Sequence, residues 1–213
     1  MKSPNLKALV VALVLIALIA TLGPVLSPPR AWAQKETKIS LPLPLKNGGM
    51  PLNEAFNKRR SRRNFVDKTL DMDILSQILW SAFGVNREAG KMRTIPTSHN
   101  RQNLKVYAIL KSGIYLYDGE AHILTLQSKG DFLPNFSGKA PLVLAYAVPI
   151  VDGAIGGIHV GSSVQNVGLY CASMGLGNVI KTTGVELLTG KLTLPEGYKI
   201  LVIHSIGYPS GNY

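Results

Sequence analysis

The stretch TIPTSHNRQNLKVYAIL, residues 94–110, joins a run of polar side chains to a segment with strand periodicity. Over residues 105–110, Val, Ala and Leu alternate with Lys and Tyr, which predicts a strand. Before it, residues 97–102 carry six hydrogen-bonding side chains directly after Pro96. We call residues 96–102 the polar loop. Such a cluster is usually a plain connection, because Pro, Ser and Asn are common turn residues. It indicates a binding loop only if other segments supply matching chemistry.

Two helices are expected before the polar loop. The first carries Leu52, Ala55 and Phe56 on one side and runs into a basic stretch. The second begins at Asp71, a residue type suited to an N-cap, and ends at Gly84, a common helix terminator. Between them an apolar stripe recurs at helical spacing, formed by Ile74, Leu75, Ile78, Leu79 and Ala82.

Five strands are expected from the polar loop to the end of the chain. Turn signals containing glycine separate the first three, and the fourth, APLVLAYAVPI, is wholly apolar, which predicts a central position in a sheet. The expected strands lie near residues 104–110, 114–118, 122–126, 140–150 and 199–208.

The remaining segments complete the expected fold. A buried helix is predicted over residues 160–174, and a loop, GLGNVIKTTG, over residues 175–184. Residues 85–103 are expected to form a long loop, and residues 34–51, with alternating prolines and a glycine pair, an extended arm. Helices and strands mix without strict alternation, so the predicted class is α+β.

The first 33 residues have the features of a secretory signal peptide. A short basic start precedes an uncharged apolar run, Gly23 and Pro24 break that run, and the sequence AWA suits cleavage after Ala33. We therefore expect an exported protein, periplasmic or extracellular. The alternative is a retained membrane anchor, because residues 8–26 are nearly long enough to span a bilayer.

The chain is basic, with a formal net charge of +11 over 213 residues, and the charge is concentrated at one place. Residues 58–63, KRRSRR, place five cations around Ser61, and we call them the basic segment. Such a run is often the solvated face of a helix. Arginine also offers planar, forked donors that match a phosphate, and a serine adds a hydroxyl. A single concentrated site suits a small anionic ligand, and we expect no nucleic acid partner.

Several common site types find no support in the sequence. Ser98 and His99 are adjacent and do not form a nucleophile–base pair with a visible acid partner. No glycine-rich phosphate loop has the required spacing. The single cysteine, Cys171, excludes an internal disulfide. No metal is expected, because no metal-ligand spacing relates the four histidines, which are His99, His122, His159 and His204.

The order of five segments decides the family. In sequence order they are EAFNKRRSRRNF, LSQILWSAFGVNR, RTIPTSHNRQNLKVYAIL with GIYLYD and HILTL, HVGSSVQNVGLYCASMGLGNV, and SIGYP. In this order they resemble the nitroreductase family of flavoproteins over residues 52–209. The pair GIYLYD and HILTL and the short GYP ending most resemble its SagB-type, thiazoline-oxidase-like branch.

The resemblance implies a nitroreductase-like fold, with a central, mainly antiparallel sheet flanked by helices and FMN bound at the interface of an intertwined homodimer. The Arg-x-Ser-x-Arg segment of the family would hold the flavin phosphate, ribityl chain and pyrimidine edge. In this chain the corresponding residues are Arg59, Arg60, Ser61 and Arg63. Of these, Arg63 would lie nearest N1 and O2 of the ring.

The resemblance also assigns the polar loop. The family's Pro-Ser-x-x-Asn-x-Gln loop contacts the flavin from the neighbouring subunit, and here it corresponds to Pro96, Thr97, Ser98, Asn100 and Gln102. After the GLG sequence, the backbone of the family approaches flavin N5. The candidates for this region are Thr182, Thr183 and Gly184, with Lys181 as a further phosphate contact.

Three departures from the family pattern change what is expected. Many members carry a basic pair after the GYP-like ending, and none follows it here, so FMN affinity would rest on Arg59, Arg60 and Lys181. A position that is often acidic in the branch is His159. The Lys-Tyr pair associated with azoline oxidation is not visible, so that activity is not expected.

These inferences predict an exported FMN-dependent oxidoreductase with a flavin-binding domain over residues 52–213. Two electrons would pass through the flavin to or from a small organic substrate, without a covalent protein catalyst. The sequence identifies neither the substrate nor the electron donor. One alternative is a flavin- or ligand-binding protein on the same fold without turnover. Another is a membrane-surface module whose basic segment contacts lipid headgroups.

Overall fold

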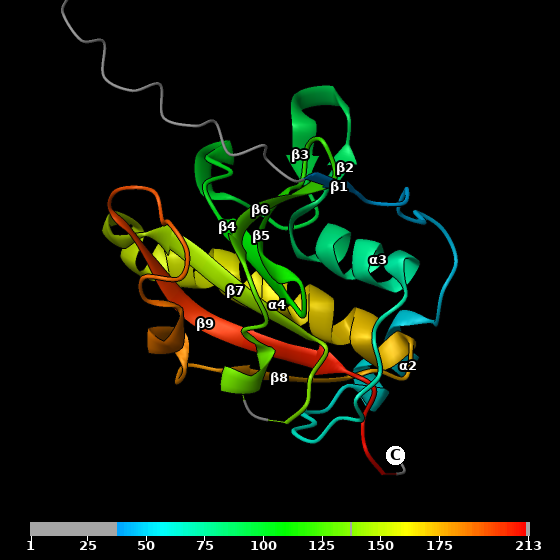
Figure 1. Ribbon diagram of the computed structural model, residues 1–213. Helices are drawn as coiled ribbons and strands as arrows, with labels where there is room; N and C mark the ends of the chain where they lie inside the picture. The colour runs from blue at the N-terminus through cyan, green and yellow to red at the C-terminus, as the bar shows by residue number, and fades with distance from the viewer. Residues whose placement is uncertain (1–37, 137, 212–213) are drawn as a thin grey trace, which may run out of the picture. The chain divides into compact units, whose positions relative to one another are not determined.

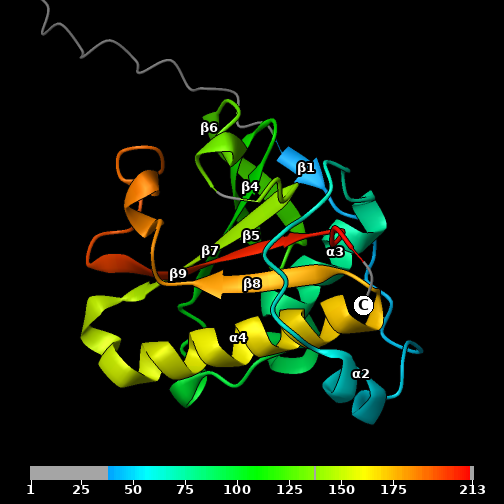
Figure 2. The same ribbon diagram turned by 90° about the horizontal axis from the view of Figure 1, so that it is seen from below.

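The computed structural model describes residues 38–136 and 138–211, which are built around a seven-stranded sheet (Figures 1 and 2). The strand order is β1-β6-β5-β4-β7-β9-β8, and every neighbouring pair is antiparallel. The strands are β1 (Lys38–Ser40), β4 (Lys105–Leu110), β5 (Gly113–Asp118), β6 (Ile123–Lys129), β7 (Leu142–Pro149), β8 (Gly177–Lys181) and β9 (Tyr198–Gly207). A separate hairpin pairs β2 (Val85–Arg87) with β3 (Met92–Arg93). The α+β class and the central antiparallel sheet are confirmed.

Helices cover one face of the sheet. The described helices are α2 (Leu52–Lys58), α3 (Met72–Phe83) and α4 (Gly153–Ser173). The apolar sides of α3 and α4 face the same core as one side of the sheet, and α2 packs against α4 (Figures 1 and 2). The opposite face is covered by short 3₁₀ segments, Leu133–Asn135 and Val185–Leu188, together with their flanking loops.

Strand β7 lies between β4 and β9 and has an apolar core on both sides. Leu144 and Tyr146 face the helices, whereas Val143 and Ala145 face the 3₁₀ segments. Successive side chains of a strand point to opposite faces, so a strand with two covered faces must be apolar throughout. The apolar run at residues 140–150 therefore predicted its central position correctly.

Residues 38–50 run as an extended arm from β1 across α3. The Leu45 backbone N–H and carbonyl both bond to the Gln77 side chain, at 2.9 and 3.0 Å. The Ser76 hydroxyl donates to the Pro42 carbonyl at 2.6 Å. The prolines of the arm lack a backbone N–H for helix bonds, so α3 side chains satisfy backbone groups of the arm.

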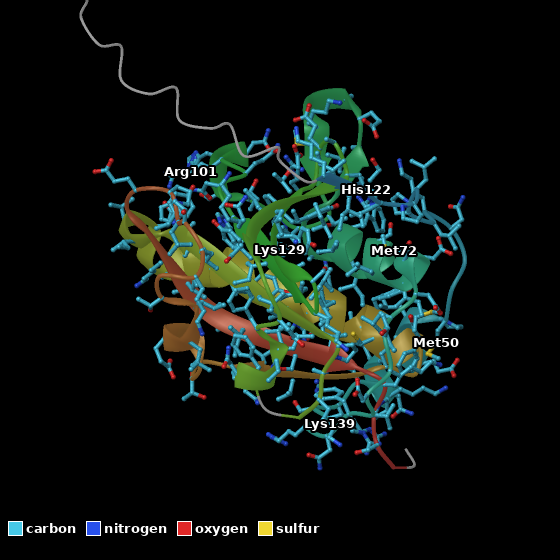
Figure 3. The ribbon with its side chains drawn as sticks, in the orientation of Figure 1. Met50, Met72, Arg101, His122, Lys129 and Lys139 are labelled. Carbon is cyan, nitrogen blue, oxygen red and sulfur yellow. The ribbon has the colours of Figure 1, made fainter. Side chains whose placement is uncertain are left out.

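His122 connects the arm to the sheet (Figure 3). Its Nε2 lies 2.8 Å from Ser76 Oγ and 3.0 Å from the Pro42 carbonyl, and its Nδ1 lies 2.8 Å from the Tyr117 hydroxyl. Burial lowers the pKa of His122, and the bond to Pro42 opposes that shift. The His122 ring thus has a structural role, because both of its nitrogens form hydrogen bonds.

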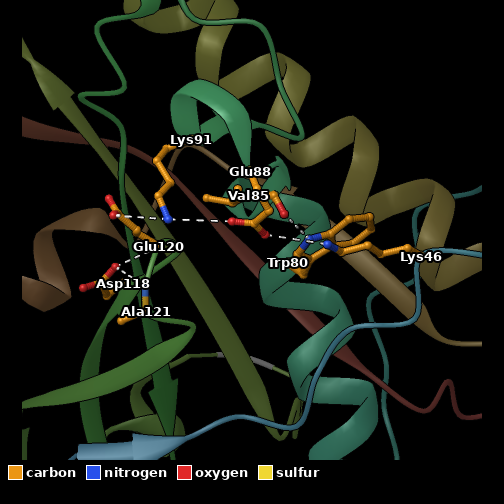
Figure 4. A network of polar contacts seen from close by, with 8 residues as sticks. All are labelled: Lys46, Trp80, Val85, Glu88, Lys91, Asp118, Glu120 and Ala121. Atoms are coloured by element: carbon orange, nitrogen blue, oxygen red, sulfur yellow. Dashed lines mark hydrogen bonds and ion pairs between the residues drawn. The ribbon is translucent and has the colours of Figure 1, made fainter.

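The region expected to be a long loop contains the β2–β3 hairpin instead. Glu88 and Lys91 lie in its turn and form a row of ion pairs with Lys46 of the arm and Glu120 of the β5–β6 turn (Figure 4). The pairs are exposed and 3.7–3.8 Å long, so each contributes little stability alone. They nevertheless fix the hairpin against two neighbouring segments.

Two further predictions were wrong in detail. The expected loop at residues 175–184 contains edge strand β8, which pairs with β9 and so overrides the weak strand preference of Gly and Asn. Helix α4 begins at Gly153, well before residue 160, although glycine is a poor helix former. Gly156 suits close packing there, because a Cβ would lie 2.8 Å from Val148 Cγ2.

Within residues 38–136 and 138–211, no helix combines the length and apolar character needed to cross a bilayer. The predicted signal peptide, residues 1–33, and the alternative anchor, residues 8–26, lie outside the described residues. Their assignment therefore stays a prediction.

Candidate active site

The basic segment, residues 58–63, leaves α2 and runs extended beside β8. The backbone N–H of Arg62 donates to the Asn178 carbonyl at 2.8 Å, and Ser61 forms an isolated parallel bridge with Asn178. Gly177 permits this approach, because a Cβ there would lie 2.9 Å from Arg62 Cβ. Beyond Lys58, the segment is thus an extended strip along the sheet edge and not a helix face.

The side chains of this strip differ in exposure. Arg62 is half-buried against the sheet edge, and Lys58 pairs with Glu54 at 2.7 Å. The four residues predicted to contact the flavin are all exposed, namely Arg59, Arg60, Ser61 and Arg63. Like charges repel unless they are solvated or share an anion, so this exposed set is suited to a phosphate or another anionic group.

A series of buried hydrogen bonds connects the sheet to the basic segment. His204 on β9 is fully buried, its Nε2–H donates to Asn178 Oδ1 at 3.0 Å, and its Nδ1 lies 3.4 Å from the Tyr146 hydroxyl. Burial lowers the pKa of His204 to about 3, so the ring is neutral at pH 7. The Asn178 carbonyl in turn accepts from Arg62, which links the buried ring to the position of the basic segment.

The C-terminal end of the described chain returns beside the basic segment. The Val66 N–H donates to the Tyr208 carbonyl at 2.9 Å, and the Ser210 N–H donates to the Asn64 carbonyl at 3.1 Å. Residues 208–211, YPSG, carry no cation. The segment after the GYP sequence therefore lies next to the arginines of the basic segment and adds no positive charge there.

The polar loop has an unusual backbone. His99, Asn100 and Gln102 have φ values of 50°, 53° and 50°, in the left-handed region that non-glycine residues rarely adopt. Gln102 Nε2 donates to Asn100 Oδ1 at 2.7 Å, and Arg93 Nε donates to Gln102 Oε1 at 2.7 Å. Burial lowers the pKa of Arg93, while the charge of Glu120 opposes this.

Asp152, directly before α4, and His159 in the helix also hold the polar loop. The buried Asp152 carboxylate accepts from Arg101 at 3.0 Å and from Asn103 at 2.8 Å, and His159 Nε2 accepts the Ser98 backbone N–H at 2.9 Å. His159 was singled out in the sequence only as a departure from the family. Its partner could not be read from the sequence, because the contact joins residues 61 positions apart.

The third predicted group follows β8. Lys181 ends the strand opposite Ile203, and Thr182 and Thr183 are exposed in the bend that follows. Gly184, at φ 90°, donates its N–H to both Glu186 carboxylate oxygens, at 3.0 and 3.1 Å. Sequence reasoning missed Glu186, which engages one of the backbone donors proposed for flavin N5.

The predicted residues fall into two groups within one chain. The basic segment pairs with the start of β8, and residues 181–184 lie at and beyond the end of that strand. The Arg59 side chain lies against α4, with its Cδ 3.7 Å from the position that a Cβ of Gly168 would take. The polar loop is held by Asp152 and His159, near the other end of α4 (Figure 3, Arg101). His159 and Gly168 are separated by about 14 Å along the helix axis at 1.5 Å per residue.

The match to known proteins defines the class. A model described as the nitroreductase family matches residues 57–208, most of the chain. The chain belongs to the nitroreductase family, a family of oxidoreductases. A Methanocaldococcus jannaschii protein that bears a nitroreductase name is 30% identical over 152 residues, covering 60% of this chain and 76% of that protein.

Solved structures agree with this assignment. A crystal structure from Ralstonia eutropha, also named as a nitroreductase, is 30% identical, with a TM-score of 0.76 over 82% of this chain and 90% of that chain. A Desulfovibrio desulfuricans structure in complex with FMN is 15% identical, with a TM-score of 0.55 over 77% of this chain and 89% of that chain. The Escherichia coli microcin synthetase complex is 16% identical, with a TM-score of 0.63 over 99% and 95%. The last two likenesses concern the fold alone.

Proposed function

We propose that this protein is an exported, FMN-dependent oxidoreductase that passes two electrons between an unidentified donor and a small organic substrate. The observation that carries the proposal is the basic segment, held extended on β8 with Arg59, Arg60, Ser61 and Arg63 turned to solvent. Their planar donors and hydroxyl match the phosphate and pyrimidine edge of FMN. Bound flavin supplies the two-electron chemistry.

The roles of the chain's own residues follow from their charge. Arg59, Arg60 and Lys181 would hold the phosphate, which carries the same charge in both redox states. Arg63 would meet the N1 and O2 edge, where a cation stabilises the negative charge of the reduced ring. Thr182, Thr183 and Gly184 would provide backbone near N5, with Gly184 available once Glu186 releases its N–H.

We further propose that the flavin lies between two copies of the chain. The polar loop and the basic segment lie apart within one chain, so a second copy would supply Pro96, Thr97, Ser98, Asn100 and Gln102 to the partner's basic segment. Exposed residues at the start of α4 support this. Ile158 is 62% exposed, with Ala154 and Gly161 on the same side of the helix, and Val151, just before the helix, is 92% exposed. Small and apolar residues on an exposed helix suit close packing against a protein partner.

Placement in the SagB-type branch rests on the GIYLYD and HILTL segments, which form the β5–β6 hairpin. Export rests on the sequence of residues 1–33, and it implies that FMN is acquired after translocation. The mature protein would then contain the arm, residues 34–51, and the flavin-binding domain, residues 52–213. Intact mass of the purified mature protein should correspond to a start at Gln34.

The absorption spectrum of the purified protein tests the proposed cofactor. A yellow protein, or a colourless one that takes up FMN in titration, with bleaching on reduction, is the expected result. Turnover with an artificial acceptor then tests oxidoreductase activity. Protein that neither contains nor binds FMN but binds anionic liposomes would support the membrane-surface alternative and refute the proposal.

A second candidate, a flavin-binding protein without turnover, is favoured by two observations. The described tail beside the arginines has no cation, and the Gly184 N–H already donates to Glu186. Stoichiometric FMN binding with no electron transfer to any acceptor would identify this candidate.

A further inference from the structure

The shape of the polar loop needs an external cause. Three of its residues, His99, Asn100 and Gln102, have left-handed backbone conformations, and none of them is glycine. Such conformations persist only where the surrounding structure over-determines them, and they cluster at functional sites. The bonds that hold the loop therefore indicate which residues prepare it for its task.

Two residues at the start of α4 provide these bonds, Asp152 directly before the helix and His159 in its second turn. The Asp152 side chain is 3% exposed and receives Arg101 Nη1 at 3.0 Å and Asn103 Nδ2 at 2.8 Å. His159 is 2% exposed and lies in the second turn of α4, and the structure brings both side chains against the same loop. Neither residue is among those that the family resemblance assigns to the flavin.

The bond made by His159 has a defined polarity. The Ser98 backbone N–H can only donate, so His159 Nε2 is the acceptor of this bond. This anchors the loop at Ser98, directly before the left-handed pair His99 and Asn100. The other end is anchored by Arg93, which donates to Gln102.

We propose that His159 and Asp152 are positioning residues that hold the polar loop in the shape required for flavin contact. The inference rests on the proposed function. It also connects the loop to the proposed interface, because the exposed Val151 and Ile158 are the immediate neighbours of Asp152 and His159. A second copy packed on α4 would thereby fix the same helix turns that hold the loop.

The test compares two substitutions of similar size. His159→Gln keeps an acceptor near the position of Nε2, whereas His159→Met removes it. In flavin-free protein, His159→Met should speed hydrogen exchange of the Ser98 amide about tenfold, and it should weaken FMN binding about five- to tenfold, as expected for one lost hydrogen bond. His159→Gln should stay within about twofold of the wild type in both.

A matched control lies on the same helix. The Ser163 hydroxyl is buried and donates to the Ala82 carbonyl at 2.7 Å, away from the loop. Ser163→Ala should lower thermal stability without changing Ser98 exchange or FMN affinity. If His159→Met does not fold, Arg101→Ala replaces it, because Arg101 is exposed and its loss removes one of the Asp152 bonds.

The outcomes separate this inference from the proposed function. Unchanged Ser98 exchange in His159→Met and Arg101→Ala would overturn the positioning role, and so would an equal loss in His159→Met and His159→Gln. Faster exchange confined to variants that lack the bond, with unchanged FMN affinity, would overturn the link to flavin. Wild-type protein that binds no FMN would refute the proposed function itself, while the exchange measurement would still decide whether α4 holds the loop.

Discussion

Acid should destabilise this fold through His204. The ring is fully buried on β9, its Nε2–H donates to Asn178, and burial lowers its pKa to about 3. In the unfolded chain the ordinary value is about 6.5. The unfolded state therefore binds a proton below pH 6.5 that the folded state refuses, and the free energy of unfolding falls as pH drops from 6.5 towards 3.

The size of the effect follows from the two pKa values. At pH 5 the unfolded ring is almost fully protonated and the folded ring is not, which removes about 2 kcal/mol of stability relative to pH 8. His122, whose pKa is also lowered by burial, adds to the loss in the same direction. Protonation of His204 would also disturb Asn178, so acid should loosen the attachment of the basic segment to β8.

Urea unfolding of flavin-free protein at pH 8, 6 and 5 measures this loss. The matched variant is His204→Gln, whose side-chain amide can still donate to Asn178 but does not titrate. Carboxylates and His122 contribute equally to both proteins, so the difference between their pH dependences isolates His204. We expect the wild type to lose about 2 kcal/mol more than the variant between pH 8 and pH 5. Equal losses would refute the reasoning, because they would mean that the folded ring accepts a proton as readily as the unfolded one.

Two further predictions concern the proposed site. Arg63→Ala should lower the two-electron flavin potential by about 30 mV if about 1.4 kcal/mol of its interaction is selective for the reduced ring, whereas Arg59→Ala should weaken FMN binding with little change in potential. A spectroelectrochemical titration with saturating FMN distinguishes them, and a larger shift in Arg59→Ala would mean that the flavin is oriented the other way. Ile158→Arg places a charge on the exposed side of α4 and should convert a dimer to a monomer in light scattering.

The sequence predicted the sheet well where patterning was strong. Residues 140–150 are apolar throughout, which is the pattern expected of a strand covered on both faces. It failed at β8, where Gly177 and Asn178 are poor strand formers and the strand exists because β9 offers a pairing edge. It also missed the start of α4, where glycines hide a helix whose packing against Val148 favours small residues.

The candidate site was predictable as a set of residue types and not as a set of contacts. Arginines around a serine, and a polar run before a strand, are visible as local clusters. The partners Asp152 and His159 were not, because an acid and a histidine near the start of a helix are compatible with many structures. Only the fold determines that both face residues more than 45 positions earlier in the chain.

A site shared between two copies makes one prediction that a single-chain site cannot match. Let one variant lose its basic segment, through Arg59→Ala with Arg63→Ala, and another its polar loop, through Asn100→Ala with Gln102→Ala. Each protein alone should bind little FMN, because each charged bond removed costs about 1.5–3 kcal/mol and each neutral one about 1 kcal/mol. In a mixed dimer, the intact segment of one chain meets the intact loop of the other, while both damaged parts fall in the second site. Random reassembly of equal amounts should therefore restore roughly a quarter of the wild-type sites, counted by flavin absorbance. If each chain built its own site, every site would still contain one damaged part, and mixing would restore none.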